Sequence, residues 1–128
     1  IPAPFGSIAF TAAVHSSSFM GRQMGTAMGL IIEMGGVTIY SAGDTGLFGD
    51  MALIGELYSP DVAILPIGDR FTMGPEHAMR AAKLVGAPIA IPVHYDTWPP
   101  IEQDPTSFAP PGIEVRILAP GESTSFGS

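Results

Sequence analysis

The 128-residue sequence has no cysteine, only five lysine and arginine residues, and few histidines. Without cysteine the chain forms no disulfide and offers no thiolate, so any metal ligands must be histidine, aspartate or glutamate. Twelve acidic residues against the five basic ones give a net charge of -7 at pH 7. This balance disfavours binding to the phosphates of nucleic acids, so we expect no nucleic-acid partner.

Long apolar runs are also missing. No stretch reaches the roughly 18 to 20 residues of a membrane helix, and the first residues lack the pattern of a signal peptide. We therefore expect a soluble, cytoplasmic protein that does not associate with a membrane. The length and a hydrophobic content of 46% allow one globular domain at most.

Short apolar runs separated by glycine and proline predict six strands, at residues 8–14, 27–33, 37–41, 62–66, 88–93 and 113–118. The second and third runs have the spacing of a β-hairpin. Residues 16–25 and 67–74 read as loops. Since strands and helical segments alternate after the hairpin, the fold class is α/β, with helices packed on a sheet.

Two helices are predicted from amphipathic spacing and end signals. Asp50 is a candidate N-cap for the first, which we expect to bury Met51, Ile54 and Leu57 and to stop at Ser59–Pro60. The second begins at Pro75 and ends before Gly86, and its expected buried stripe consists of Ala78, Met79, Ala82 and Val85.

His15, Asp44 and His94 stand out because each directly follows, or closely follows, a predicted strand. Open α/β sheets place ligand sites at the carboxyl ends of their strands. Two imidazoles and a carboxylate are suitable ligands for zinc, manganese or iron, and such an ion supports hydrolysis by activating water. The three residues are therefore candidate metal ligands.

Each residue also has a simpler interpretation. Asp44 in the sequence Gly-Asp-Thr-Gly also fits an Asx-turn at the end of a strand, and His15 before three serines also fits a hydrogen-bonded loop residue. His94 is harder to explain in this way, because it ends a buried strand. His77 lies in the first turn of the second predicted helix, and we expect it on the surface.

Four segments together resemble the C-terminal part of the metallo-β-lactamase superfamily. They are HSSS after an apolar strand, GGVTIYSAGDTGLFGDM, PDVAILPIGDRFTMGPEHA and AIPVHYDTWPPIEQDP. Within that superfamily they most resemble metal-dependent hydrolases related to ascorbate-6-phosphate lactonase. The resemblance covers nearly the whole chain in the family's order. It implies that residues 1–128 are the C-terminal half of an αββα sandwich, with a mixed sheet and helices on one face.

The resemblance also implies roles. His15 becomes a ligand of a first metal, Asp44 the carboxylate that bridges two metals, and His94 a ligand of the second. The implied cofactor is a pair of divalent ions, two zinc ions or alternatively manganese or iron. The implied chemistry is attack by a metal-bound hydroxide on a lactone, ester, amide or phosphoester, with Asp44 and His94 at the reacting centre. Thr45, Tyr95 and Asp96 would then orient the ligands.

The family's N-terminal His-x-His-x-Asp-His segment, which supplies four further ligands, does not occur in this sequence. The sequence also begins at Ile1 without an initiator methionine. We therefore expect the chain to work with an N-terminal half of the same domain or as an oligomer, because a half sandwich exposes an apolar face. Its other partner would be a small-molecule substrate.

Substrate clues are sparse. Arg22 lies in the first loop, Arg70 lies in the second, and Trp98 follows His94; each arginine could bind a phosphate or carboxylate or could simply be solvated.

Two further functions remain open. Asp44-Thr45-Gly46 could be the active triplet of a dimeric aspartic protease, although that fold is nearly all β and gives the histidines no task. Alternatively, the chain could be a non-catalytic half-domain or interaction module with an incomplete metal site.

Overall fold

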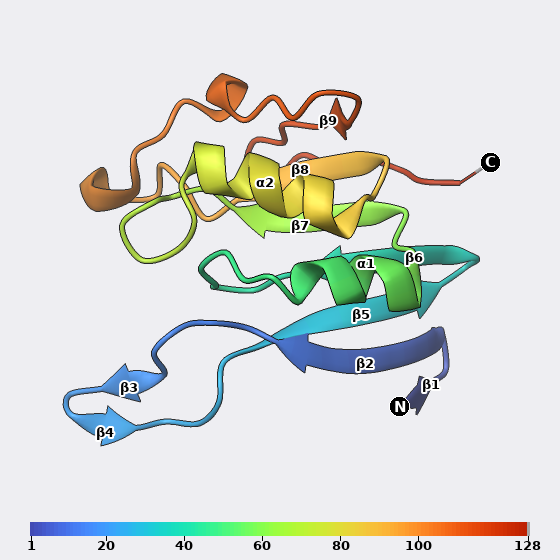
Figure 1. Ribbon diagram of the computed structural model, residues 1–128, viewed down its shortest axis with the longest axis horizontal. Coiled ribbons are helices and arrows are strands. Elements are labelled where there is room, and N and C mark those ends of the chain that lie inside the picture. Colours follow the sequence, from blue (N-terminus) through green and yellow to red (C-terminus); the bar gives the residue numbers. More distant parts are fainter. Residues whose placement is uncertain (128) are drawn as a thin grey trace.

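The structure is a computed structural model that describes residues 1–127. Most of the chain forms one seven-stranded mixed sheet in the order β1-β2-β5-β6-β7-β8-β9, and a separate two-stranded hairpin projects from it (Figure 1). The elements are β1 Pro2–Ala3, β2 Gly6–Ala12, β3 Ser18–Phe19, β4 Arg22–Gln23, β5 Met28–Met34, β6 Val37–Ser41, α1 Met51–Tyr58, β7 Val62–Pro66, α2 Pro75–Val85, β8 Ile89–Val93, the 3-10 turns η1 Pro99–Ile101 and η2 Pro105–Ser107, and β9 Glu114–Val115.

Strand direction determines where the loops meet. β2, β5 and β6 pair antiparallel, whereas β6, β7, β8 and β9 pair parallel. Strands β2, β6, β7 and β8 therefore run in the same direction, and their carboxyl ends lie at one edge of the sheet. The segments that carry His15, Asp44 and His94 leave the sheet at that edge, as the sequence predicts.

Both helices cover the same face of the sheet (Figure 1). Side chains from the central strands that point to this face form the core with the helices, among them Ile31, Tyr40, Ala63, Leu65 and Ala90. These residues occupy alternate positions that face one side of the pleat. The predicted α/β class with helices on one face is confirmed, and parallel strands with helices are incompatible with the all-β fold that the aspartic protease alternative requires.

Helix α2 has the predicted boundaries. Pro75 is its first residue, and Gly86 ends it in a left-handed conformation with φ 74°, which glycine adopts without steric cost. The buried stripe is Ala78, Ala81, Ala82 and Val85, whereas Met79 is only partly buried. His77 is exposed, as expected.

Helix α1 differs from the prediction in two details. Asp50 occupies the N-cap position, but its side chain makes no capping hydrogen bond. Instead, backbone carbonyls of the preceding turn accept from the first amides, with Phe48 O bonding Met51 N at 3.2 Å. Met51 and Ile54 are buried, but Leu57 is 72% exposed, because one turn of so short a helix presents only a narrow face to the sheet.

The two segments predicted least well both contain strands of only two residues. Residues 16–25 are not simply a loop, since they contain the β3–β4 hairpin, whose tip places Met20 and Gly21 at positive φ. β9 covers only two of the six residues predicted as the last strand. Arg116 N still donates to Ala90 O at 3.0 Å, but the next donor from β8 would be Pro92, which has no N–H.

The face of the sheet that carries no helix, here called the rear face, is apolar. Ile8, Ile32, Ile39, Val62 and Ile89 pair in a continuous row across it. On the same side of the pleat, Phe10 is 56%, Met28 46% and Met34 48% exposed. The predicted exposed apolar surface is therefore present along β2 and β5, whereas Val62 in the middle of the row is buried.

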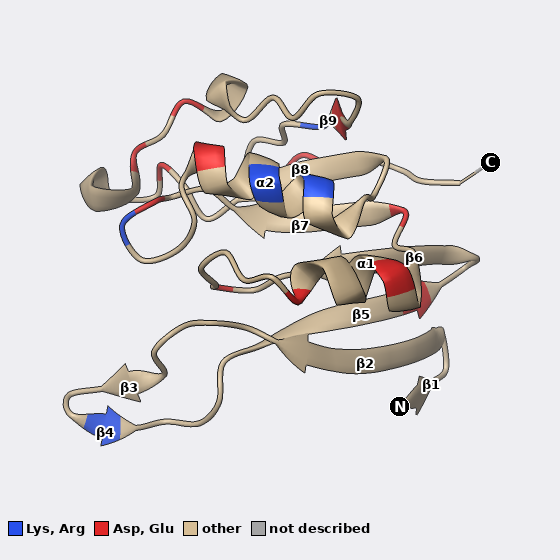
Figure 2. Ribbon diagram, viewed as in Figure 1, with Lys and Arg blue, Asp and Glu red and all other residues tan. Residues whose placement is uncertain are grey.

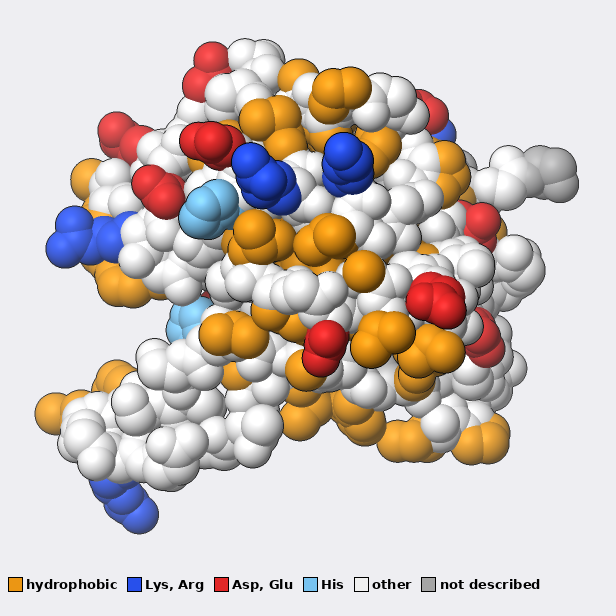
Figure 3. All heavy atoms as spheres, in the orientation of Figure 1, with side chains coloured by type: hydrophobic (Ala, Val, Ile, Leu, Met, Phe, Trp, Pro, Cys, Tyr) orange, Lys and Arg blue, Asp and Glu red, His pale blue; other side chains and the backbone are white. Residues whose placement is uncertain are grey.

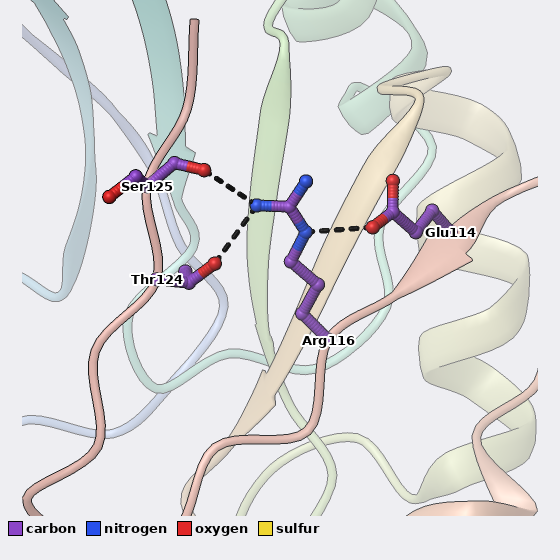
Figure 4. A network of polar contacts seen from close by, with 4 residues as sticks. All are labelled: Glu114, Arg116, Thr124 and Ser125. Atoms are coloured by element: carbon purple, nitrogen blue, oxygen red, sulfur yellow. Dashed lines mark hydrogen bonds and ion pairs between the residues drawn. The ribbon is translucent and has the colours of Figure 1, made fainter.

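The C-terminal segment is held near the amino ends of the central strands by Arg116 (Figure 4). The Arg116 guanidinium donates to Glu114 Oε1 at 2.8 Å, to Thr124 Oγ1 at 2.9 Å and to the Ser125 carbonyl at 2.8 Å. It also lies 4.9 Å from the ring centroid of Phe126, a cation–π distance. Within residues 1–127, no helix is long and apolar enough to cross a membrane.

Candidate metal centre

Asp44 and His94 meet at the carboxyl edge of the sheet. His94 directly follows β8, and Asp44 lies three residues after the end of β6. Asp44 Oδ1 lies 3.5 Å from His94 Nε2, and the two side chains are 49% and 31% exposed. Two residues that are distant in sequence thus present donor atoms to one solvent-accessible point.

The His94 backbone is held in an unusual conformation. His94 has φ 56°, in the left-handed region that residues other than glycine seldom adopt. Gly68, after β7, packs against it so closely that a Cβ at position 68 would overlap the His94 carbonyl oxygen and lie 3.3 Å from Nδ1. Strain of this kind persists where the surrounding structure requires it, often at functional sites.

The two ring nitrogens of His94 have different surroundings. Nδ1 is buried and has no hydrogen-bond partner within residues 1–127. Nε2 points to the Asp44 carboxylate, which leaves it as the nitrogen able to bind a ligand.

Thr45 joins the segment after β2 to the segment after β6. Its side chain is fully buried, and its hydroxyl accepts from Val14 N at 2.9 Å and donates to the Gly46 carbonyl at 2.8 Å. Gly46 N donates to the Val14 carbonyl at 2.9 Å. Thr45 therefore ties the backbone next to His15 to the backbone next to Asp44.

His15 is partly buried, and its Nδ1 contacts the carbonyl oxygen of Ser16. A carbonyl only accepts, so Nδ1 is the donor, and Nε2 is the nitrogen that carries the lone pair in the neutral ring. However, no group of three or more histidine, aspartate or glutamate side chains arranged to hold a metal is found in residues 1–127. The structure brings Asp44 and His94 together and leaves His15 outside that pair, although its neighbour Val14 is bonded to the Asp44 loop.

The loop after His94 is braced against the loop after β7. Asp96, at φ 61°, donates its N–H to the Ile101 carbonyl and accepts from Gln103 N at 2.9 Å. Gln103 Nε2 lies 3.5 Å from the Gly68 carbonyl. Desolvation by burial, together with the charge of Asp96, raises the pKa of Tyr95 above its ordinary value. The roles of Gly68 and Gln103 were not predicted from the sequence. The only available signal for Gly68 was its position as a glycine just after a buried strand.

The atoms of this pair suit a divalent cation. Ligands at about 2.0 to 2.1 Å from a tetrahedral ion lie about 3.3 to 3.4 Å apart, close to the 3.5 Å between Asp44 Oδ1 and His94 Nε2. One carboxylate oxygen and one imidazole nitrogen are also the donor types that zinc, manganese and iron accept.

The molecule is hollowed beside this edge. Figure 3 shows a notch between the β3–β4 hairpin and the body that carries the loops after β7 and β8. Basic residues are few in this acidic chain, yet one lies on β4 of the hairpin and another in the loop between β7 and α2 (Figure 2). These two are Arg22 and Arg70.

Comparison with known proteins identifies the family of this chain. The sequence model of the "Beta-lactamase superfamily domain" matches residues 2–95, well over half of the chain. The chain belongs to this superfamily. The metallo-β-lactamase resemblance is thus confirmed, whereas a specific relation to ascorbate-6-phosphate lactonase stays a prediction.

Similar proteins carry the name UPF0173 metal-dependent hydrolase. One from Geobacillus thermodenitrificans is 54% identical over 127 residues, and the match covers 93% of the present chain and 56% of the relative. One from Methanospirillum hungatei is 55% identical, covering 90% and 57% respectively. The chain therefore spans about half the length of the curated relatives it matches.

A solved structure shows the same fold. Igni18, described as a novel metallo hydrolase from Ignicoccus hospitalis, superposes with a TM-score of 0.84 at 44% identity, covering 94% of this chain and 53% of that one. An isothiocyanate hydrolase from Delia radicum gut bacteria has a TM-score of 0.74 at 24% identity and shares the fold.

Proposed function

We propose that this chain is part of a metal-dependent hydrolase and supplies Asp44 and His94 to its metal centre. The observation that supports this most is the 3.5 Å approach of Asp44 Oδ1 to His94 Nε2 at the carboxyl edge of the sheet. The names of relatives about 50% identical support the same activity. The substrate would be a lactone, ester, amide or phosphoester.

The residues of the site would have two kinds of role, holding the cation and positioning His94. Asp44 and His94 would hold the cation, and Gly68 and the Asp96–Gln103 contact would keep His94 in place. A bound cation polarises a carbonyl or phosphoryl oxygen and makes hydroxide available from water near neutral pH. The Asp44 side chain is about half exposed, so a cation held there would be accessible to substrate and water.

The finer features of the site are also proposals. We propose two divalent ions, zinc in the first instance, with Asp44 shared between them and His15 as a further ligand. The bond from Thr45 to Val14 supports the last role, because it keeps the His15 segment beside the Asp44 loop. We also propose a cytoplasmic location and a relation to ascorbate-6-phosphate lactonase-like enzymes.

The apolar rear face supports a proposal about the partner. Exposed Phe10, Met28 and Met34 form part of a surface that is costly to leave in water. We propose that an N-terminal half of the same domain covers this face and adds metal ligands, since the relatives are nearly twice as long as the matched region. Association of two copies of this chain is the alternative. Native mass spectrometry should show one of these assemblies, and a stable monomer of 13.3 kDa would contradict both.

Metal content and chelator sensitivity test the catalytic proposal. The purified assembly should contain at least about one divalent ion and should hydrolyse ester or lactone substrates until a chelator is added, with recovery on addition of zinc or manganese. Asp44→Asn should lower both metal content and turnover. Asp50→Asn is the matched control, since Asp50 is exposed and makes no capping bond.

The outcomes separate the alternatives. A metal-free assembly with no hydrolysis would favour a non-catalytic half-domain. Hydrolysis that is indifferent to chelators and to Asp44→Asn would contradict a metal mechanism at this pair.

A further inference from the structure

Two aromatic side chains from different loops form a stacked pair at the end of the sheet that carries the candidate metal centre. Phe71 and Trp98 have ring centroids 5.7 Å apart and planes inclined by only 6°. Phe71 lies in the loop after β7, and Trp98 lies in the loop that begins at His94. Both loops leave the sheet at its carboxyl edge, so the pair belongs to the same end of the molecule as Asp44 and His94.

Both aromatic side chains of the pair remain partly open to solvent. Phe71 and Trp98 are each 49% exposed, so their stacking buries one side of each ring and leaves a planar apolar surface in water. Their mutual contact alone does not require this exposure, because an aromatic pair gains more by being covered. A surface of this kind is suited to stack against a planar group of a ligand.

Hydrogen bonds close both loops that carry the pair. Asp69, at φ 73°, donates its N–H to the Met73 carbonyl at 3.0 Å. The second loop is closed by the Asp96–Ile101 and Gln103–Asp96 bonds described above, and Gln103 connects it to Gly68 of the first. These bonds favour one conformation of the loops that hold the rings, and preorganisation of this kind limits the entropy lost when a ligand binds.

A cation adjoins the pair. The Arg70 guanidinium carbon lies 5.9 Å from the Phe71 ring centroid. Within residues 1–127, Arg70 forms no salt bridge, whereas Arg116 does. An unpaired arginine next to an aromatic surface provides a local positive charge for an anion, against the negative net charge of the chain as a whole.

We propose that Phe71, Trp98 and Arg70, here called the aromatic platform, bind a substrate whose planar aromatic or conjugated group carries a phosphate or carboxylate. The rings stack on the planar group, and Arg70 pairs with the anionic group. This inference rests on the proposed function for its substrate, but binding to the platform does not require metal or turnover.

The only tryptophan of the chain reports on this binding directly. We would titrate the full chain, in the assembly in which it is isolated and with chelator present, with phenyl phosphate while recording tryptophan fluorescence. Trp98→Phe identifies the part of the signal that comes from Trp98. Phenyl phosphate should quench this signal saturably, whereas methyl phosphate, without a ring, and benzyl alcohol, without charge, should bind at least about tenfold more weakly.

Matched variants test each part of the platform. Phe71→Leu should weaken phenyl phosphate binding about tenfold, whereas Phe5→Leu should not, since Phe5 is 47% exposed but lies near the opposite edge of the sheet. Arg70→Gln should remove the preference for phenyl phosphate over benzyl alcohol, and Arg80→Gln on α2 should retain it. Circular dichroism melting shows whether each variant is folded. If Phe71→Leu does not fold, Arg70→Gln, which changes only an exposed side chain, still tests the platform.

Failure of this inference is distinct from failure of the proposed function. Absent quenching, equal affinity for all three probes, or unchanged binding to folded Phe71→Leu and Arg70→Gln would overturn the platform even in an active hydrolase. Selective binding by a protein that hydrolyses nothing would support the platform and contradict the proposed function.

Discussion

Replacement of Gly68 by alanine tests the packing that positions His94. The added Cβ would overlap the His94 carbonyl oxygen and would lie 3.1 Å from Ile101 Cβ and 3.3 Å from His94 Nδ1. The first of these atoms belongs to the backbone and cannot rotate away. Gly68 is not among the residues at positive φ, so the expected effect is steric.

The expected magnitude follows from two opposing effects. Overpacking of a tight site costs about 1 to 3 kcal/mol, and the lower entropy of the unfolded alanine chain returns about 0.4 to 1 kcal/mol. We therefore expect Gly68→Ala to lower the free energy of unfolding by about 1 to 2 kcal/mol. A displaced His94 should also weaken metal binding by about 10- to 100-fold, the usual effect of disturbing the groups that orient a ligand.

Urea unfolding measures the first effect, and calorimetric zinc titration measures the second. Gly49→Ala is the control, because a Cβ there would meet nothing within 4 Å and its φ is not positive. If Gly68→Ala matched Gly49→Ala in both stability and zinc affinity, the argument that close packing at position 68 holds His94 would be refuted.

Three further substitutions test other contacts. Tyr40→Phe should change the free energy of unfolding by no more than about 1 kcal/mol at pH 7, since the buried Tyr40 hydroxyl has no partner with full hydrogen-bond geometry in residues 1–127 and has only the Thr11 side chain as a polar neighbour. Burial raises the pKa of Tyr40 to about 12, so between pH 10 and 12 the tyrosine ionises only in the unfolded chain. The free energy of unfolding of the wild type should therefore fall by about 1.4 kcal/mol per pH unit over this range. Urea midpoints that fall equally in Tyr40→Phe would contradict this. Gly55→Ala in α1 should destabilise despite alanine's helix propensity, because its Cβ would overlap the Val85 carbonyl, and a raised melting temperature would show that the helices can separate. Thr45→Val should cost about 1 to 3 kcal/mol by leaving Val14 N unpaired and should weaken zinc binding; an unchanged urea midpoint would argue against the bridge.

Local sequence signals predicted most of the elements that lie near the site. Pro75 and Gly86 correctly bounded α2, and two glycines at positive φ formed the tight turn between β5 and β6. These predictions succeeded because proline and glycine act on the backbone within one or two residues. The length of β9 was overestimated because it depends on the backbone N–H groups that β8 can donate, and Pro92 of β8 has none.

What the sequence by itself determined is which residues stand at strand ends and could serve as ligands. His94 follows β8, and Asp44 and His15 each follow a strand that runs in the same direction. Their placement at one edge needed only the alternation of elements and the direction of the strands, both of which short-range patterns indicate.

Only the tertiary structure decided which of these side chains converge. The pairing of Asp44 with His94, the glycine at position 68 that makes room for it, and the stack of Phe71 on Trp98 each join segments separated by more than twenty residues. Such contacts depend on the lateral order of strands in the sheet and on loop conformations with positive φ at Asp69, His94 and Asp96. No local propensity specifies these features, because non-glycine residues adopt that conformation only when the surrounding fold compensates its cost.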